Sequence, residues 1–258
     1  MKSVDILGYN IRAEPRDNYR DEIKRVLLGV DRNCTWMACL NPHSYAVARG
    51  AEEFRTALNS ADWLVPDGIG IVISSIILGR RVEERITGND IFECVMSELD
   101  QRQGSVFFLG STGRTLDLIA QKLPLDYPNI RLVGVYSPPF KQEFDDAENQ
   151  AMIAAIAAVK PDVLWVGMTA PKQEKWIAAH RDELPVKFAG AIGAVFDFYT
   201  GQIKRSHPAF QRLGLEWLPR LVQEPRRLWR RMFVSAPIFL FDVFRSAVFD
   251  RRPKARTP

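Results

Sequence analysis

The sequence is poor in the residues that build metal centres and disulfide frameworks. Its 258 residues include three cysteines and three histidines. Cys34, Cys39 and Cys94 are odd in number and show no C-x-x-C spacing, and the histidines are scattered along the chain. These spacings support neither a zinc site nor a set of disulfide bonds. We therefore expect reduced, mostly buried thiols, as in a cytoplasmic protein, and no metal ion.

Long uninterrupted apolar segments are also missing. The N-terminal residues MKSVDILGYNI pass from one lysine directly into a short strand-like run, so they do not predict a secretory signal. Near the other end, the apolar run from Met232 to Leu240 is soon followed by Asp242. About 20 apolar residues are needed to cross a bilayer. If this region meets a membrane, we expect it to lie on the surface and not to span the bilayer.

Several motifs of nucleotide and sugar chemistry are absent as well. No two aspartates have the D-x-D spacing that is frequent in metal-dependent sugar transferases, and there is no G-x-G-x-x-G, P-loop or G-x-S-x-G motif. A dinucleotide or P-loop site is therefore unsupported, and no cofactor is expected. If the protein binds a diphosphate, arginines and helix N-termini must supply the positive charge that a metal ion supplies elsewhere.

What the chain does contain is an uneven distribution of charge. Residues 205–258 hold 12 Lys and Arg against 4 Asp and Glu, a net charge of +8, whereas residues 1–204 hold 23 against 27, a net charge of −4. In the basic segment, arginines precede an aromatic-rich apolar stretch, a combination that suits an anionic membrane surface. A packed pair of helices and a nucleic-acid-binding tail are the alternatives, and we favour the membrane.

The first 204 residues predict the fold. Short apolar runs alternate with longer amphipathic ones, which is typical of an α/β protein with a Rossmann-like, mainly parallel sheet and helices on both faces. We expect this core over residues 1–204 and a basic helical appendage over residues 205–258. The expected strands are 4–7, 35–40, 63–65, 105–109, 130–136, 163–167 and 187–191. The expected helices are 17–28, 44–58, 69–78, 90–100, 115–123, 145–159 and 172–181.

Polar and glycine-rich residues follow the predicted strands. In open α/β sheets, ligands bind at the carboxyl ends of the strands. These loops should therefore meet at one edge of the sheet and form the site. They are Asn41-Pro42-His43, Pro66-Asp67-Gly68, Gly110-Ser111-Thr112-Gly113, Ser137-Pro138-Pro139 and residues 168–173.

Asp67 is the carboxylate in these loops best placed for chemistry. It lies directly after a predicted strand and before a predicted helix, so it is either the N-cap of that helix or a general base for an acceptor hydroxyl. The segment RRVEERITGND then brings Arg80, Arg81 and Arg85 close in sequence. Each is an ordinary surface arginine by itself, but together they could hold a diphosphate.

The loop FFLGSTGRT joins a strand to a helix N-terminus. Its two glycines and two hydroxyls lie where backbone N–H groups and the helix dipole can bind phosphate. A simple tight turn explains the same residues equally well. Gly110 is the loop residue that we expect to approach a ligand.

Taken in order, the motifs of this chain resemble those of the WecG/TagA/CpsF glycosyltransferases of bacterial cell-envelope polysaccharide synthesis. The resemblance extends from about Val4 to Arg231. The motif GLEWLPRLVQEPRRLWRR is the most specific, because its tryptophan, arginine and proline spacing has no general structural explanation. The other motifs are NPHS, VPDGIG, RITGND, FFLGSTG, GMTAPKQEKW and GAVFDFYTGQIKR.

The resemblance implies an activity and a location. Members of this family transfer a sugar from a UDP-sugar to a polyprenyl-diphosphate-linked saccharide at the cytoplasmic face of the membrane, with inversion and without a metal ion. Their donors include N-acetylmannosamine, its uronic acid and glucose, and the sequence does not distinguish these. It also allows a homo-oligomer, and we expect no nucleic-acid partner. A non-catalytic component that binds a nucleotide sugar or a lipid is the alternative.

The resemblance also assigns roles to residues. Asp67 corresponds to the proposed base, and Asn41, Arg85 and Gln173 to other active-site residues. The C-terminal arginines that are thought to fold over the donor diphosphate correspond to Arg220, Arg226 and Arg227.

Two positions depart from the family pattern. Cys39 replaces a common threonine, which removes a hydroxyl donor from a substrate-binding position. The loop after the fifth predicted strand is YSPPF instead of glycine-rich. There Tyr136 is a candidate to stack on uracil, with a core tyrosine as the alternative.

Overall fold

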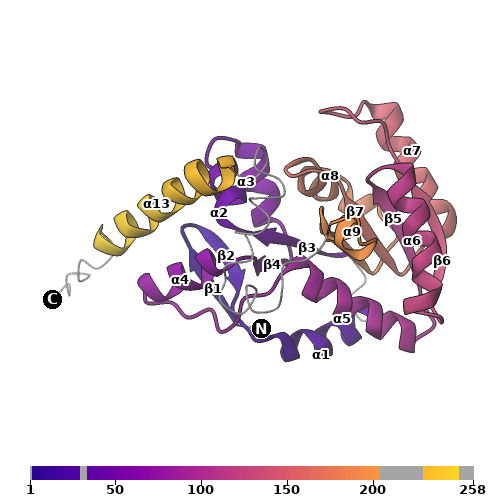
Figure 1. Ribbon diagram of the computed structural model, residues 1–258, viewed down its shortest axis with the longest axis horizontal. Coiled ribbons are helices and arrows are strands. Elements are labelled where there is room, and N and C mark those ends of the chain that lie inside the picture. Colours follow the sequence, from indigo (N-terminus) through magenta and orange to yellow (C-terminus); the bar gives the residue numbers. More distant parts are fainter. Residues whose placement is uncertain (1, 30–33, 204–228, 250–258) are drawn as a thin grey trace.

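The structure is a computed structural model that describes residues 2–29, 34–203 and 229–249 (Figure 1). Its centre is a six-stranded parallel sheet in the order β4-β3-β8-β7-β5-β6, which confirms the predicted Rossmann-like α/β class. The strands of this sheet are β3 (Thr35–Leu40), β4 (Trp63–Pro66), β5 (Ser105–Gly110), β6 (Arg131–Tyr136), β7 (Val163–Gly167) and β8 (Phe188–Ala191).

Helices cover both faces of the sheet. The longer ones are α1 (Arg16–Leu27), α5 (Gly88–Gln101), α6 (Gly113–Asp126), α7 (Asp146–Val159) and α13 (Ala236–Phe249). The shorter ones are α2 (Pro42–Ala48), α3 (Glu52–Asn59), α4 (Ile69–Ile77), α8 (Lys172–His180) and α9 (Val195–Tyr199).

The core consists of two layers because side chains alternate along the strands. In β5, Phe107 and Leu109 join the buried cluster under α2, α3, α4, α7, α8 and α13, whereas Val106 and Phe108 join the cluster under α1, α5, α6 and α9. All four side chains are at most 3% exposed. A strand buried on both faces is continuously apolar, which explains why these strands were recognisable in the sequence.

Three elements differ from the sequence prediction. The expected helix 44–58 is two helices, because the chain turns at Gly50 and Ala51 takes an extended conformation before α3. An additional strand, β2 (Tyr9–Arg12), forms an antiparallel hairpin with β1 (Ser3–Ile6). Its turn residues Leu7 and Gly8 both have positive φ, as a two-residue type I′ turn requires. The short helix α9 was also not predicted.

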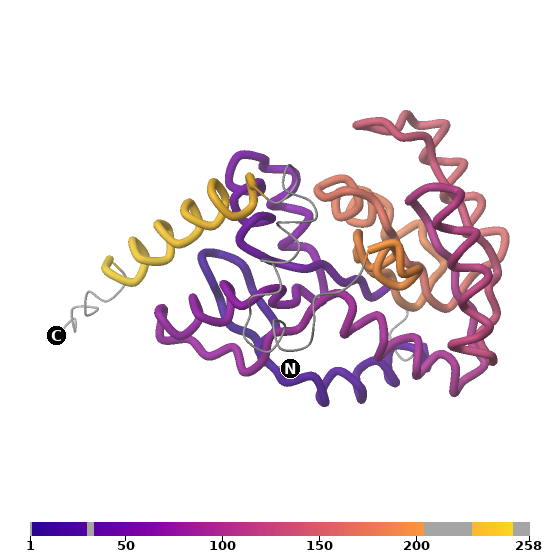
Figure 2. The backbone as a smooth tube through the Cα atoms, viewed as in Figure 1, coloured from indigo at the N-terminus to yellow at the C-terminus, as the bar shows by residue number. Residues whose placement is uncertain are grey.

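Helix α13 extends from the body at the C-terminal end. A π-helical turn, Arg231–Ser235, leads into it, and the helix packs against α2 and α4. Figure 2 shows the yellow helix beginning beside the body and running outward from it. The boundary expected near residue 204 and most of the basic segment, residues 204–228 and 250–258, lie outside the described residues.

The helix is longer than the apolar run on which the prediction of surface binding was based. The helix continues through Asp242, and by length and composition alone the 19 residues Arg231–Phe249 could cross a bilayer. The carboxylate of Asp242 is turned toward the body. There it accepts a hydrogen bond from Tyr45 Oη at 2.9 Å and lies 3.5 Å from Arg49 Nε.

Candidate active site

A cavity of about 830 Å³ lies at the carboxyl ends of the parallel strands. Such a volume is typical of small-ligand sites, and the position is the one expected for an open α/β sheet. The loops after β3, β4, β5, β6, β7 and β8 all contribute to its lining. Of the predicted site residues, Cys39, Asn41, Asp67, Gly110 and Gln173 line this cavity.

Asn41 connects helix α2 to the carboxylate of Asp67. Its side-chain oxygen caps α2 by accepting hydrogen bonds from the backbone nitrogens of His43 at 3.0 Å and Ser44 at 2.9 Å. Its amide Nδ2 donates to Asp67 Oδ2 at 3.3 Å. Because the cap fixes the amide, the donor is held facing the carboxylate.

Asp67 follows the last residue of β4. Its backbone nitrogen donates to Leu40 O at 2.9 Å, which ties this turn to the end of β3. The N-cap residue of α4 is Gly68, at φ +93°, and no side chain caps the helix there. The N-cap alternative for Asp67 is therefore wrong. Its carboxylate lies instead beside Asn41 at the cavity wall.

Gln173 lies in the first turn of α8, which follows the inner strand β7. Its side-chain oxygen accepts a hydrogen bond from the backbone nitrogen of Met168 at 3.1 Å, and its Nε2 donates to Glu174 Oε1 at 2.9 Å. Both side chains are almost completely buried, with Gln173 5% and Glu174 4% exposed. The amide of Gln173 therefore has a single orientation.

Glu174 also lines the cavity, and the sequence analysis did not single it out. Its second oxygen, Oε2, is buried and makes no hydrogen bond within the described part of the chain. Burial raises the pKa of this carboxyl to about 7, against the opposing effect of the hydrogen bond from Gln173. A glutamate in a first helical turn is ordinary in a sequence, so only packing identifies this one.

Cys39 lies in the same wall of the cavity. Burial raises the pKa of its thiol well above the usual value, and the negative charges of Asp67 and Glu174 raise it further. The thiol is therefore neutral near pH 7. In contrast with the threonine that the resemblance predicts, it offers only a weak donor.

The loop after β5 is a tight turn that also faces the cavity. Gly110 has φ +106°, and a side chain there would place Cβ 2.6 Å from Gly167 O. The next residue, Ser111, donates from its backbone nitrogen to the same carbonyl at 2.8 Å, and Thr112 caps α6. Glycine is thus required at this position, and the N-terminus of a 14-residue helix opens on the cavity.

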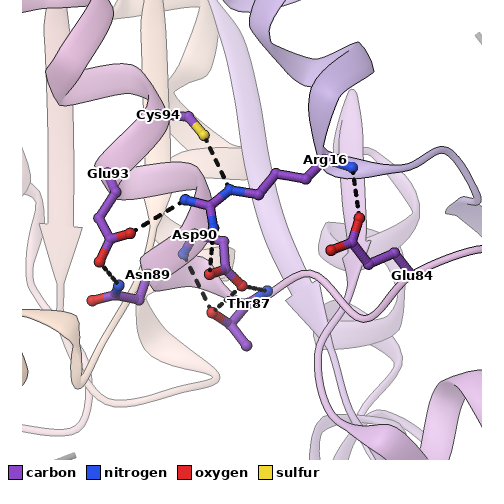
Figure 3. Close-up of polar contacts among 7 residues, drawn as sticks. All are labelled: Arg16, Glu84, Thr87, Asn89, Asp90, Glu93 and Cys94. Carbon is purple, nitrogen blue, oxygen red and sulfur yellow. Dashed lines mark hydrogen bonds and ion pairs between the residues drawn. The ribbon is translucent and has the colours of Figure 1, made fainter. Parts of the chain in front are cut away.

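The start of α5 forms another part of the wall, and it is held by polar contacts with α1 (Figure 3). Thr87 and Asp90 form a capping box. The guanidinium of Arg16 lies 3.5 Å from Asp90 and 3.2 Å from Glu93. Thr87 and its two successors line the cavity, so this network holds that part of the wall in place.

The three arginines expected beside Asp67 do not meet in the cavity. Arg80, Arg81 and Arg85 are absent from its described lining. Arg80 is directed away, because its guanidinium binds the side chain and carbonyl of Asp5 in β1. Arg231 lines the cavity instead. Arg220, Arg226 and Arg227 lie outside the described residues.

Tyr136, the candidate to stack on uracil, does not lie in the described lining of the cavity. It packs against the core instead. Phe140, four residues later in the proline-rich loop, lines the cavity and is 98% exposed. Lys172 Nζ lies 5.7 Å from the centre of its ring. The sequence YSPPF shows that an aromatic residue follows two prolines, but it does not show that this residue is exposed.

The C-terminal helix reaches this site through α2. His43 Nδ1 lies 2.9 Å from Ser235 Oγ, and burial, followed by the charges of Arg231 and Arg230, lowers the pKa of His43 to about 4. The imidazole is therefore neutral near pH 7. Phe239 and Val243 are fully buried in the same contact. Helix α2, whose N-cap is Asn41, is thus also a helix against which α13 packs.

Metal-binding side chains do not gather in this site. Across residues 2–29, 34–203 and 229–249, no group of three or more His, Cys, Asp or Glu side chains could hold a metal ion.

Comparison with known proteins agrees with the predicted resemblance. The N-acetylglucosaminyldiphosphoundecaprenol N-acetyl-beta-D-mannosaminyltransferase of Bacillus spizizenii is 32% identical over 213 residues, which cover 83% of this chain and 80% of the relative. The protein of the same name from Staphylococcus aureus is 27% identical over 240 residues, covering 93% and 91%.

A family-wide comparison extends over almost the entire chain. Residues 4–253 match the Glycosyl transferase WecG/TagA/CpsF family. This range includes every loop that lines the cavity. The predicted resemblance is therefore confirmed: the chain belongs to the WecG/TagA/CpsF family of glycosyltransferases.

Proposed function

We propose that this protein transfers a sugar from a UDP-sugar to a polyprenyl-diphosphate-linked saccharide, with inversion and without a metal ion. The observation that carries the proposal is the placement of Asp67. Its carboxylate lies at the wall of the cavity at the carboxyl ends of the strands and receives a hydrogen bond from Asn41. A carboxylate in this position can accept the proton of a bound hydroxyl.

The reaction is a single displacement. Asp67 takes the proton of the acceptor hydroxyl, whose oxygen forms a bond to the anomeric carbon of the donor. The bond from that carbon to the UDP oxygen breaks, and its electron pair leaves with UDP. Asn41 fixes the direction of the carboxylate, and attack from the side opposite the leaving group inverts the anomeric centre.

The charge that grows on UDP must be stabilised within the same cavity. Arg220, Arg226 and Arg227 are the residues proposed for this task, assisted by the N-terminus of α6 at Gly113. Arg231 supports this scheme because it lines the cavity from the C-terminal side. Preorganised positive charge of this kind replaces the divalent cation used by other transferases.

The relatives indicate the substrates to test first. Their names specify an N-acetylmannosaminyl group as the one transferred and N-acetylglucosaminyl-diphosphoundecaprenol as the acceptor. We propose the same acceptor class for this chain. N-acetylmannosamine is the first candidate donor sugar, with its uronic acid and glucose as alternatives.

Such an acceptor is confined to a membrane, and α13 is suited to meet it there. Exposed apolar side chains cover much of its surface, including Phe241 at 64%, Phe244 at 57% and Val248 at 68%. We propose that α13 lies on the cytoplasmic face of the membrane. Spanning the bilayer would pull Phe239 and Val243 away from α2, where they are fully buried.

A donor panel tests this function. The full-length protein is incubated with the UDP derivatives of the three candidate sugars and a short-chain diphosphate acceptor carrying N-acetylglucosamine, with and without EDTA. Mass spectrometry should detect one added sugar from one donor, at the same rate in both conditions. Loss on chelation that Mg²⁺ restores would refute the metal-independent scheme, and no product from any donor would favour a non-catalytic binding role.

A further inference from the structure

Helix α4 has an unusual arrangement of polar and apolar side chains. Ile69, Ile73 and Ile76 are 38%, 46% and 67% exposed, whereas Ser74 and Ser75 are fully buried. The isoleucines are spaced four and three residues apart and therefore form one stripe along the helix. A helix in contact with water normally has the opposite arrangement, so the outer face of α4 is suited to a nonpolar neighbour.

The buried serines show that this orientation is built into the fold. Ser74 Oγ donates to Gly70 O at 2.7 Å, and Ser75 Oγ donates to Val72 O at 2.7 Å. Ser75 Oγ also accepts from Val82 N at 3.1 Å. Both hydroxyls are hydrogen-bonded inside the protein, so burial leaves no unpaired polar group. Rotating α4 to expose the serines would therefore bring no gain in hydrogen bonding.

A second helix with exposed apolar side chains lies beside α4. Helix α13 packs against α4, and Figure 1 shows both at the same end of the molecule, opposite α6 and α7. In the described residues 229–249, the exposed charged side chains are Arg230 and Arg245. Asp242, the acidic residue of this segment, is bonded to Tyr45 and Arg49. The combined surface is therefore apolar with cationic charge, which complements an anionic bilayer better than a second copy of the same basic surface.

We propose that the exposed isoleucine stripe of α4 is a second membrane-docking element, which inserts into the bilayer interface together with the exposed face of α13. This inference rests on the proposed function, because the acceptor is then a lipid of that bilayer. Helix α4 begins two residues after Asp67. Docking through α4 therefore holds the cavity wall that carries Asp67 at the membrane surface, where the diphosphate-linked sugar of the acceptor lies.

The test replaces the most exposed members of the stripe without changing charge. The double variant Ile73→Gln/Ile76→Gln is compared with Leu125→Gln, a matched change at an 81% exposed residue of α6. Co-sedimentation is measured with vesicles of equal parts phosphatidylglycerol and phosphatidylcholine at high salt, where arginine contacts are screened. Because Ile73 and Ile76 face outward, both variants should keep the thermal midpoint of the parent protein.

We expect the double variant to bind these vesicles at least about tenfold more weakly and the Leu125 variant to bind normally. Turnover of a vesicle-borne polyprenyl acceptor should fall in parallel, while turnover of a water-soluble analogue should not change. Unchanged vesicle binding would overturn the proposal. The proposal would also be overturned if the parent protein is a dimer, the double variant is a monomer, and both bind vesicles equally. The stripe would then be the contact with a second copy of the chain.

The proposed function can fail separately from this inference. If no donor gives product on either acceptor but the double variant still loses vesicle binding, the membrane-docking role of α4 is supported and the proposed sugar transfer is refuted.

Discussion

At the scale of single residues, Asn41 combines two tasks that can be separated. Its side-chain oxygen caps α2, and its amide donates to Asp67. Serine also caps helices well, but it cannot reproduce the amide donor. The two tasks therefore predict different results for two substitutions at one position.

Asn41→Ser should keep the stability of the parent protein while lowering turnover by about tenfold, because one hydrogen bond to the base is worth about 1.4 kcal/mol. Asn41→Ala should lower turnover similarly and also cost about 1 kcal/mol of stability through the lost cap. Urea denaturation and steady-state turnover of both variants measure the two effects. If Asn41→Ser has full turnover, the amide does not assist Asp67.

Glu174 gives a prediction about pH. Its pKa is about 7 in the folded protein, raised by burial from an ordinary value of 4.5. Below pH 4.5 the carboxyl is protonated in both states. As pH rises toward 7, the unfolded chain releases the proton first, so the free energy of unfolding falls, by up to about 3 kcal/mol above pH 7.

Glu174→Gln removes this ionisation and should make stability less dependent on pH. Urea unfolding of both proteins at pH 5 and pH 8 measures it. The free energy of unfolding of the variant, relative to that of the parent protein, should be higher at pH 8 than at pH 5. Parallel behaviour of the two proteins would show that Glu174 is ionised inside the fold or does not titrate there.

The residues of the site were predictable where the backbone alone places them. Asn41 and Asp67 directly follow strands, and Gln173 lies in the first turn of the helix after β7; the ends of parallel strands meet at one edge. Glu174 and Phe140 were missed because burial of one and exposure of the other depend on tertiary packing. Arg80 was misplaced for a similar reason, since its partner Asp5 belongs to the hairpin β1–β2, which the sequence analysis did not predict.

At the scale of elements, α13 serves both the fold and the proposed membrane contact through different faces. Phe239 and Val243 are buried against the body, whereas Phe241 and Phe244 are exposed. A chain shortened before Phe233 loses both faces at once. Substitutions on each face separate the two contributions.

Phe239→Ala should destabilise the protein by about 3–5 kcal/mol, the usual cost of truncating a buried phenylalanine. Phe241→Gln/Phe244→Gln should leave the thermal midpoint nearly unchanged but weaken binding to anionic vesicles. Calorimetry and co-sedimentation of both proteins provide the comparison. Normal vesicle binding by the double variant would remove α13 from the membrane contact.

Most elements were predicted because hydrophobic periodicity is strong in a doubly covered sheet. The errors occurred where local geometry decides. Gly50 and the extended Ala51 divide the expected helix 44–58, and the turn at Leu7 and Gly8 depends on positive φ at a leucine. Leucine is not a typical residue for such a turn, so no sequence pattern indicated β2.

At the scale of the whole molecule, the cavity and the apolar surfaces lie on connected elements. Helix α2 carries Asn41 at its N-terminus and supports α13 on its side. Helix α4 follows Asp67 and exposes its isoleucines next to α13. The proposed base therefore lies next to the start of α4 and is bonded to the N-cap of the helix that supports α13, and these are the two elements that we propose to dock on the membrane.

The central claim is that Asp67 is the general base of the transfer, and Asp67→Asn tests it most directly. The substitution keeps the size of the side chain but removes its ability to accept a proton. Turnover should fall by about 10² to 10⁴, while calorimetric binding of UDP remains as in the parent protein. An Asp67→Asn protein that binds UDP normally and turns over at nearly the parental rate would contradict the account.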